Sequence, residues 1–228
     1  MKTKKNLRKY RKYLITFLVV SLFSIISFFI LGPKLIDKTT ITHSDVDIRT
    51  PVNFKIAFIG DQGYGGNSTA VLKMIKSEGA DMVIHSGDFE YKNNPDAWDS
   101  QISNALGSNF PYFASIGNHE LNAWEGYQEK MKSRLKRIDG AVCVGNLGIA
   151  SACTYKGIFF ILSGIGTKGY FADVSKFPFY APWRFPYNII TKPSQLLHSI
   201  YIKNQLASNN FTWKICSWHK NQKLMQTG

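Results

Sequence analysis

The chain has 228 residues and a mass of 25.8 kDa, enough for one sizeable domain. Hydrophobic residues make up 44% and charged residues 19%, which excludes wholesale disorder, a collagen-like repeat and a small disulfide scaffold. The net charge of +13 is concentrated at the N-terminus, because residues 1–12 hold seven of the 28 basic side chains and no acid. We therefore expect no nucleic-acid partner.

An apolar stretch follows the basic segment. Residues 14–31 carry no charge, and as a helix they span about 27 Å, close to the hydrocarbon thickness of a bilayer. The pattern predicts a basic cytoplasmic segment over 1–12, a transmembrane signal anchor over 13–32 and a stalk over 33–51. Basic residues precede the span, so the N-terminus is expected in the cytoplasm and the following domain outside the cell membrane. A cleaved signal peptide, giving a secreted protein, is the alternative.

Beyond the stalk, strand-like and helix-like stretches alternate. The β-rich runs predict strands over 53–60, 81–87, 111–117, 154–164 and 213–218. Apolar residues at helical spacing predict helices over 68–79, 97–106, 123–139 and 194–208. A hairpin is expected around 143–163, and a long surface loop over 164–193. This alternation favours an α/β layered domain over residues 52–228.

The three cysteines leave at least one thiol unpaired within the chain. Cys143 and Cys153 flank a Gly-rich turn that is short enough to be closed by a disulfide outside the cell. Two free thiols in a hairpin are the alternative. Cys216 lies in an apolar run and is expected to behave as a small buried hydrophobic residue.

Polar residues follow a glycine at the end of three predicted strands. Asp61 follows the first strand, Asp88 the second, and Asn118 and His119 the third, while His219 follows the last strand of the chain. Ligands of α/β sheets gather at the carboxyl ends of strands, so these side chains can meet in space. Each corner alone is more typical of a simple turn than of a site. As an ordered set, carboxylates, an amide oxygen and imidazoles indicate a metal site.

The motifs GDQG, GDFEY, GNHE and KICSWH closely resemble those of the calcineurin-like metallophosphoesterase superfamily, specifically its purple acid phosphatase branch. Gly63 stands where the broad superfamily commonly has a histidine, and Tyr91 stands three residues after Asp88, as in the purple acid phosphatases. The resemblance covers residues 53–228. It implies a four-layer α/β/β/α sandwich.

The resemblance also implies a dinuclear centre of iron(III) and a divalent iron, zinc or manganese ion. Asp61 and Tyr91 would bind the first metal, and Asp88 would bridge both. Asn118 and His219 would bind the second metal. Tyr91 would bind as a phenolate, whose charge transfer to iron gives a purple colour.

The implied function is a metal-dependent phosphoester hydrolase, an acid phosphatase-like phosphomonoesterase that uses metal-bound hydroxide. His119 would orient the phosphate and protonate the leaving group. The alternatives are a phosphodiesterase with the same centre, and a non-catalytic, membrane-anchored module that binds phosphate or metal. The family also carries a later G-H-x-H motif that is not found in this chain. The resemblance therefore predicts a domain that is incomplete at the C-terminus, from a longer enzyme.

Several neighbouring residues have simpler interpretations. Tyr91 could be an ordinary packed tyrosine, and His85 is expected to pack in its strand near the site. His198 is expected to be packed or solvated. Glu90 and Glu120 could hydrogen-bond to the site residues, or Glu120 could only cap its own turn.

Overall fold

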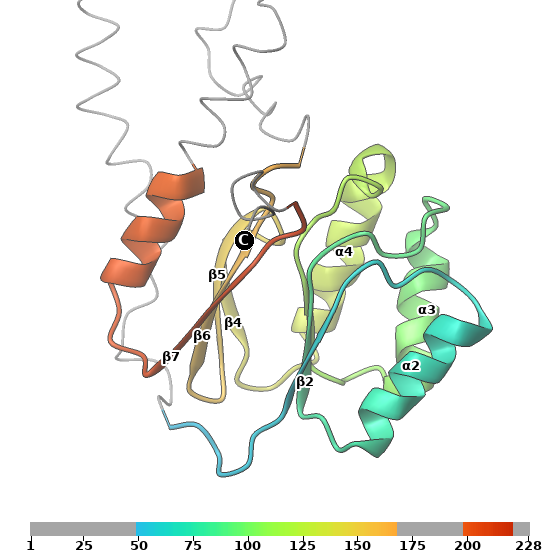
Figure 1. Cartoon of the computed structure of the whole chain (residues 1–228), viewed down its shortest axis with the longest axis horizontal. Helices are drawn as coiled ribbons and strands as arrows, with labels where there is room; N and C mark the ends of the chain where they lie inside the picture. The colour runs from blue at the N-terminus through green and yellow to red at the C-terminus, as the bar shows by residue number, and fades with distance from the viewer. Residues whose placement is uncertain (1–48, 168–197, 221–228) are drawn as a thin grey trace, which may run out of the picture. The chain divides into compact units, whose positions relative to one another are not determined.

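The computed structural model describes residues 49–167 and 198–220 (Figure 1). The expected cytoplasmic segment at 1–12, the membrane span at 13–32 and almost all of the stalk lie outside these residues. Within the described ranges, no helix is both long enough and apolar enough to cross a membrane. The anchor therefore stays a prediction from the sequence.

A parallel three-stranded sheet has the order β1-β2-β3. Its strands are β1 (Ile56–Ile59), β2 (Met82–His85) and β3 (Tyr112–Ala114), connected by α2 (Gly66–Ser77) and α3 (Pro95–Leu106). All residues of β2 are buried, as expected of a central parallel strand that is covered on both faces. Asn94 caps α3 by accepting a hydrogen bond from the Ala97 N–H, and Pro95 begins the helix.

The second sheet has four strands in the order β4-β5-β6-β7. They are β4 (Val142–Asn146), β5 (Ala150–Tyr155), β6 (Ile158–Ser163) and β7 (Trp213–Ser217). The first three are antiparallel, and β7 runs parallel to β6. Residues 198–207, the described part of the expected last helix, are helical and precede β7.

Alternate side chains of β6 enter two different cores. Phe160 points into the core between the sheets, where its ring lies 4.7 Å from that of Phe113 on β3. Phe159 and Ile161 belong to a second core, to which the helix at 198–207 contributes Ile202 and Leu206 among others. On the far side of the first sheet, helix α3 packs Trp98 against Tyr112. The described residues thus place helices, two sheets and a further helix in successive layers (Figure 1).

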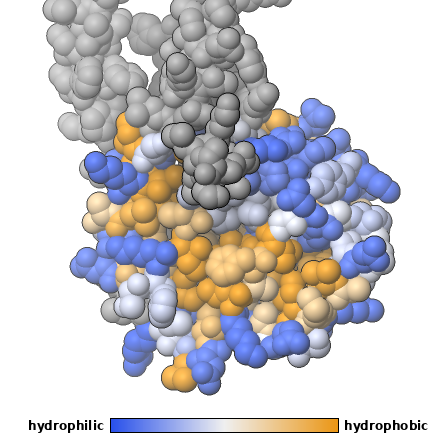
Figure 2. Space-filling model, in the orientation of Figure 1, coloured by the Kyte–Doolittle hydropathy of each residue, from blue (hydrophilic) through white to orange (hydrophobic). Residues whose placement is uncertain are grey.

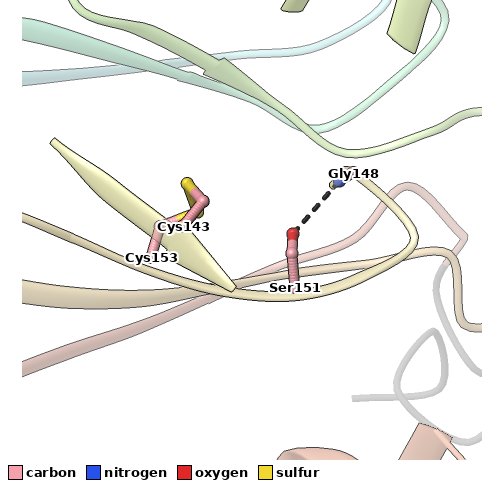
Figure 3. Close-up of a disulfide and its surroundings, with 4 residues drawn as sticks. All are labelled: Cys143, Gly148, Ser151 and Cys153. Carbon is pink, nitrogen blue, oxygen red and sulfur yellow. Dashed lines mark hydrogen bonds between the residues drawn. A yellow bond between two sulfur atoms is a disulfide. The ribbon is translucent and has the colours of Figure 1, made fainter. Parts of the chain in front are cut away.

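A disulfide joins β4 to β5 (Figure 3). Cys143 and Cys153 are directly paired in the antiparallel ladder, with their Cα atoms 4.0 Å apart. In the turn between these strands, the Gly148 N–H donates to Ser151 Oγ at 3.1 Å. The expected disulfide is confirmed and the free-thiol alternative is wrong. Cys216 is half-buried at the edge of the second core.

Two sequence expectations differ from the structure in their boundaries. The strand expected over 154–164 contains a two-residue hairpin turn, at Lys156 (φ 47°) and Gly157 (φ 75°). Positive φ at both positions suits the twist of a tight hairpin, so β5 and β6 are separate strands. Helix α4 (Trp124–Leu135) is preceded by the 3-10 turn η3 (Leu121–Ala123) and ends before the expected residue 139. There the i→i−3 hydrogen bonds of Arg137 and Ile138 replace the helical pattern.

The outer strands of both sheets expose aromatic side chains. Phe58 on β1 is 62% exposed, and Trp213 on β7 is 59% exposed. The space-filling view shows a contiguous apolar area on the face of the molecule that is turned toward the viewer (Figure 2). Among the residues that the structure describes, no further strand pairs with β1 or β7. Unpaired edges and apolar patches are the surfaces most prone to association.

Candidate metal centre

The loops that follow β1, β2 and β3 lie at one edge of the parallel sheet. They carry Asp61, Asp88 and Asn118 respectively. The first two loops are joined by backbone hydrogen bonds, from the Asp61 N–H to Gly87 O and from the Gln62 N–H to Asp88 O, both at 3.0 Å. A fourth residue, His219, comes from the other sheet. It follows β7, which ends at Ser217, and lies at the same edge as Asp61 and Asp88.

Asp61, Asp88 and His219 form a cluster in which one ligand atom of each lies within 4.8 Å of the others. Asp88 is buried, with 3% of its surface exposed. Nε2 of His219 lies 3.2 Å from Oδ2 of Asp88. The other ring nitrogen, Nδ1, lies 3.1 Å from the carbonyl oxygen of Ser86. Since that carbonyl only accepts, the contact assigns the ring proton of a neutral His219 to Nδ1.

This tautomer leaves a lone pair on Nε2 that faces a carboxylate oxygen. Two acceptors at 3.2 Å attract each other only when a cation or a proton lies between them. Metal-binding histidines characteristically donate their second ring N–H to a backbone carbonyl, as His219 does. The donor set therefore fits a metal ion.

Asn118 adds an amide oxygen to this set. Its Oδ1 atom is buried and has no hydrogen-bond partner among the described residues. The next residue in the loop, His119, donates its backbone N–H to Asp88 Oδ1 at 3.1 Å, which places the loop against the carboxylate. A buried oxygen without a hydrogen-bond partner, in a loop that contacts a carboxylate, is a group that a hard metal ion could satisfy.

Tyr91 and His119 lie on the open side of the cluster. The Tyr91 hydroxyl donates to Asp61 Oδ1 at 2.8 Å, and its ring lies 4.5 Å from the His119 ring, edge to face. The His119 side chain is 47% exposed, with Nε2 3.8 Å from Asp88 Oδ2. Desolvation, and then the hydrogen bond and the charge of Asp61, raise the pKa of Tyr91 above its usual value. A bound cation would act in the opposite direction.

Three of the clustered residues have left-handed backbone conformations. The φ angles are 50° at Asp61, 57° at Asp88 and 63° at Tyr91. Residues other than glycine rarely adopt this region, and such strain gathers at functional sites. The structure thus brings together the side chains of Asp61, Asp88, Tyr91, His119 and His219. Asn118 lies in the loop directly before His119, and the chemical roles of all six residues stay predictions.

A chain of side-chain hydrogen bonds that the sequence did not predict begins at Gln62, the residue after Asp61. The Tyr112 hydroxyl donates to Gln62 Oε1 at 2.7 Å and lies 2.8 Å from His85 Nδ1. Gln62 Nε2 donates to Gln101 Oε1 at 3.0 Å, and Gln101 Nε2 donates to Gly65 O at 3.1 Å. This chain fixes the loop after β1 to β2, β3 and α3. The residues of this chain of hydrogen bonds are distant in sequence. Only the position of Gln62 next to Asp61 could have indicated from the sequence that Gln62 supports the site. His85 is fully buried, as expected.

The family model of the calcineurin-like phosphoesterases matches residues 54–223. The match contains all seven strands described above and the residues of the cluster. No curated protein matches the chain significantly.

Proposed function

The chain belongs to the calcineurin-like phosphoesterase family, and from this premise we propose that the cluster around Asp88 hydrolyses phosphomonoesters with two metal ions. Membership of the family supports metal-dependent hydrolysis of phosphoesters in general. The observation that carries the proposal for this chain is the pair formed by His219 and Asp88. Its two facing acceptor atoms, with the second ring nitrogen fixed to Ser86, suit a cation.

We assign the metal ligands as the sequence suggested. Asp61 and Tyr91 would hold one ion, Asn118 and His219 the other, and Asp88 would bridge them. The ions, when bound, would lower the pKa of a water molecule and neutralise charge on the phosphoryl oxygens. The Tyr91 hydroxyl oxygen lies 2.8 Å from Asp61 Oδ1, so both oxygens are close enough to bind one ion. Because a phenolate is a hard anionic ligand that favours iron(III), this contact supports an acid phosphatase-like centre with iron(III) beside a divalent iron, zinc or manganese ion.

His119 would act on the substrate itself. Its imidazole is half-exposed beside Asp88, so it can reach a phosphate from the solvent side. The Tyr91 ring restricts its orientation, and the backbone N–H of His119 holds Asp88 at the same time. We therefore assign His119 to hydrogen-bond a phosphoryl oxygen and to donate a proton to the leaving alkoxide.

The decisive experiment is hydrolysis of a chromogenic phosphate monoester by the full chain, with iron, zinc or manganese added. Turnover should require metal and disappear in Asp88→Ala. Asp96→Ala is the matched control, because Asp96 lies on the exposed face of α3 and pairs with Lys130. Faster turnover of a diester would assign a phosphodiesterase instead. If the protein binds metal or phosphate but hydrolyses neither ester, it is a binding module and the enzymatic proposal is wrong.

We also propose that residues 13–32 anchor the protein in the cell membrane, with residues 1–12 in the cytoplasm. The seven basic residues before the span support this orientation. An anchored protein stays in the membrane fraction at alkaline pH, and a variant without residues 1–33 is released. Recovery of a shortened chain from the medium would identify a cleaved signal peptide instead.

A further inference from the structure

Glu120 is almost fully buried beside the cluster, with 1% of its surface exposed. It accepts three backbone hydrogen bonds. Oε1 accepts from the Phe89 N–H at 2.7 Å, and Oε2 accepts from the N–H groups of Asp88 at 3.0 Å and Gly117 at 2.8 Å. Two donors belong to the loop after β2 and the third to the loop after β3. One carboxylate therefore joins the two loops that carry Asp88 and Asn118.

The hydrogen bonds of Glu120 reach further along the chain than those of a residue that only caps its own turn. The hydrogen bond from Gly117 spans three residues, as a cap would. Those from Asp88 and Phe89 span 32 and 31 residues and reach across to another strand of the sheet. Among the described residues, the last backbone hydrogen bond from the β3 segment to β2 runs from the Ser115 N–H to His85 O. Beyond it, Glu120 provides a connection between the two loops.

The position of this connection matters for the ligand atoms. Asp88 receives the His119 N–H on Oδ1, so its carboxylate is oriented by the loop that Glu120 holds in place. A shift of that loop would move Asn118 and rotate Asp88 together. Without Glu120, three buried N–H groups would lose their acceptor. The loops could then keep this arrangement only at a cost in folding free energy.

We propose that Glu120 is a positioning residue of the metal centre: it sets the separation between Asp88 and Asn118 and thereby the affinity for metal. This inference rests on the proposed function, since it assumes that these side chains bind metal. Glu120 is assigned no contact with metal or substrate. It acts through the backbone of both loops.

The test compares Glu120→Gln with Glu90→Gln in the full chain. Glu90 is equally buried, at 2% exposed, but its carboxylate accepts from the Asn94 N–H and the Tyr127 hydroxyl. In Glu120→Gln, the new amide NH₂ must face at least one backbone N–H, whichever way the amide is turned. We expect Mn²⁺ affinity, measured by calorimetry, to fall about 10–100-fold in Glu120→Gln and to stay at the wild-type value in Glu90→Gln.

Amide hydrogen exchange of the metal-free proteins gives a second readout that is independent of activity. Exchange at Asp88, Phe89 and Gly117 should accelerate in Glu120→Gln only. Wild-type Mn²⁺ affinity or unchanged exchange in this variant would overturn the inference. If the wild type binds no Mn²⁺, the proposed metal function fails, and exchange still decides whether Glu120 holds the loops. Should Glu120→Gln not fold, Glu120→Asp withdraws the carboxylate by one methylene, and wild-type Mn²⁺ binding by that variant would equally overturn the inference.

Discussion

Gly87 and Gly117 are in direct backbone contact. A Cβ atom on Gly87 would lie 2.6 Å from N and 2.7 Å from Cα of Gly117, and 2.9 Å from Cβ of His219. The glycines of the second and third motifs are therefore required because the loops that carry Asp88 and Asn118 touch at these two positions.

The first prediction concerns Gly117→Ala. The added methyl group would lie 2.2 Å from Asp88 Oδ1 and 2.3 Å from Asp88 N, so the loops must separate. We expect a loss of stability of about 3 kcal/mol, at the upper end for an overpacked site, together with weaker metal binding. Urea denaturation measures the first effect. Gly66→Ala is the control, since its methyl group meets nothing within 4 Å, and an equal loss in both variants would exclude the steric explanation.

The second prediction concerns the colour of the iron-loaded protein. If Tyr91 binds iron(III) as a phenolate, the loaded protein absorbs visible light, and Tyr91→Phe loses this band while Asp88 remains to hold metal. Absorption spectra before and after iron loading provide the measurement. A colourless, iron-containing wild type would show that Tyr91 only hydrogen-bonds to Asp61.

The third prediction is a loss of stability in mild acid. Burial, with a smaller effect from His219, lowers the pKa of His85 from 6.5 to about 3. Between these values the unfolded chain binds a proton that the folded protein excludes. The contribution to stability is therefore complete above pH 6.5 and is lost as the pH falls towards 3, by up to about 1.4 kcal/mol for each pH unit.

Urea midpoints between pH 7 and pH 4.5 test this expectation. The slope should be shallower in His85→Asn, which keeps a polar group near the Tyr112 hydroxyl but has no titrating ring. His198 contributes with the same sign, because burial lowers its pKa to about 4. Equal slopes in the wild type and in His85→Asn would contradict the assignment to His85.

The fourth prediction concerns the disulfide between Cys143 and Cys153, which closes a loop with a sequence separation of 10. Its removal from a loop of this size should destabilise the protein by about 2–3 kcal/mol, through a larger conformational freedom of the unfolded chain. Urea unfolding with and without reductant measures this difference. A Cys143→Ala, Cys153→Ala double variant should no longer respond to reductant, whereas Cys216→Ala should respond like the wild type.

The sequence was most informative where local chemistry determines structure. Glycine followed by Asp61, Asp88 or Asn118 identified the corners of the site, because a turn after a strand has a strong local pattern. It could not show that Asp61 and Asp88 have positive φ angles, since their conformations depend on contacts between loops. The sequence did not predict the hairpin turn at Lys156, because residues of high β propensity stand on both sides of it. Glu120 was ambiguous because two of its three donors lie more than 30 residues away.

The alternation along β6 also limits how this domain can change in evolution. Each residue of this strand from Ile158 to Leu162 belongs to one of two cores. A single inserted or deleted residue would therefore exchange Phe160 with Phe159 or Ile161 between them. Both cores would then have the wrong shapes at once. We expect length variation among relatives to be excluded from β6, while substitutions that preserve size on each face are tolerated.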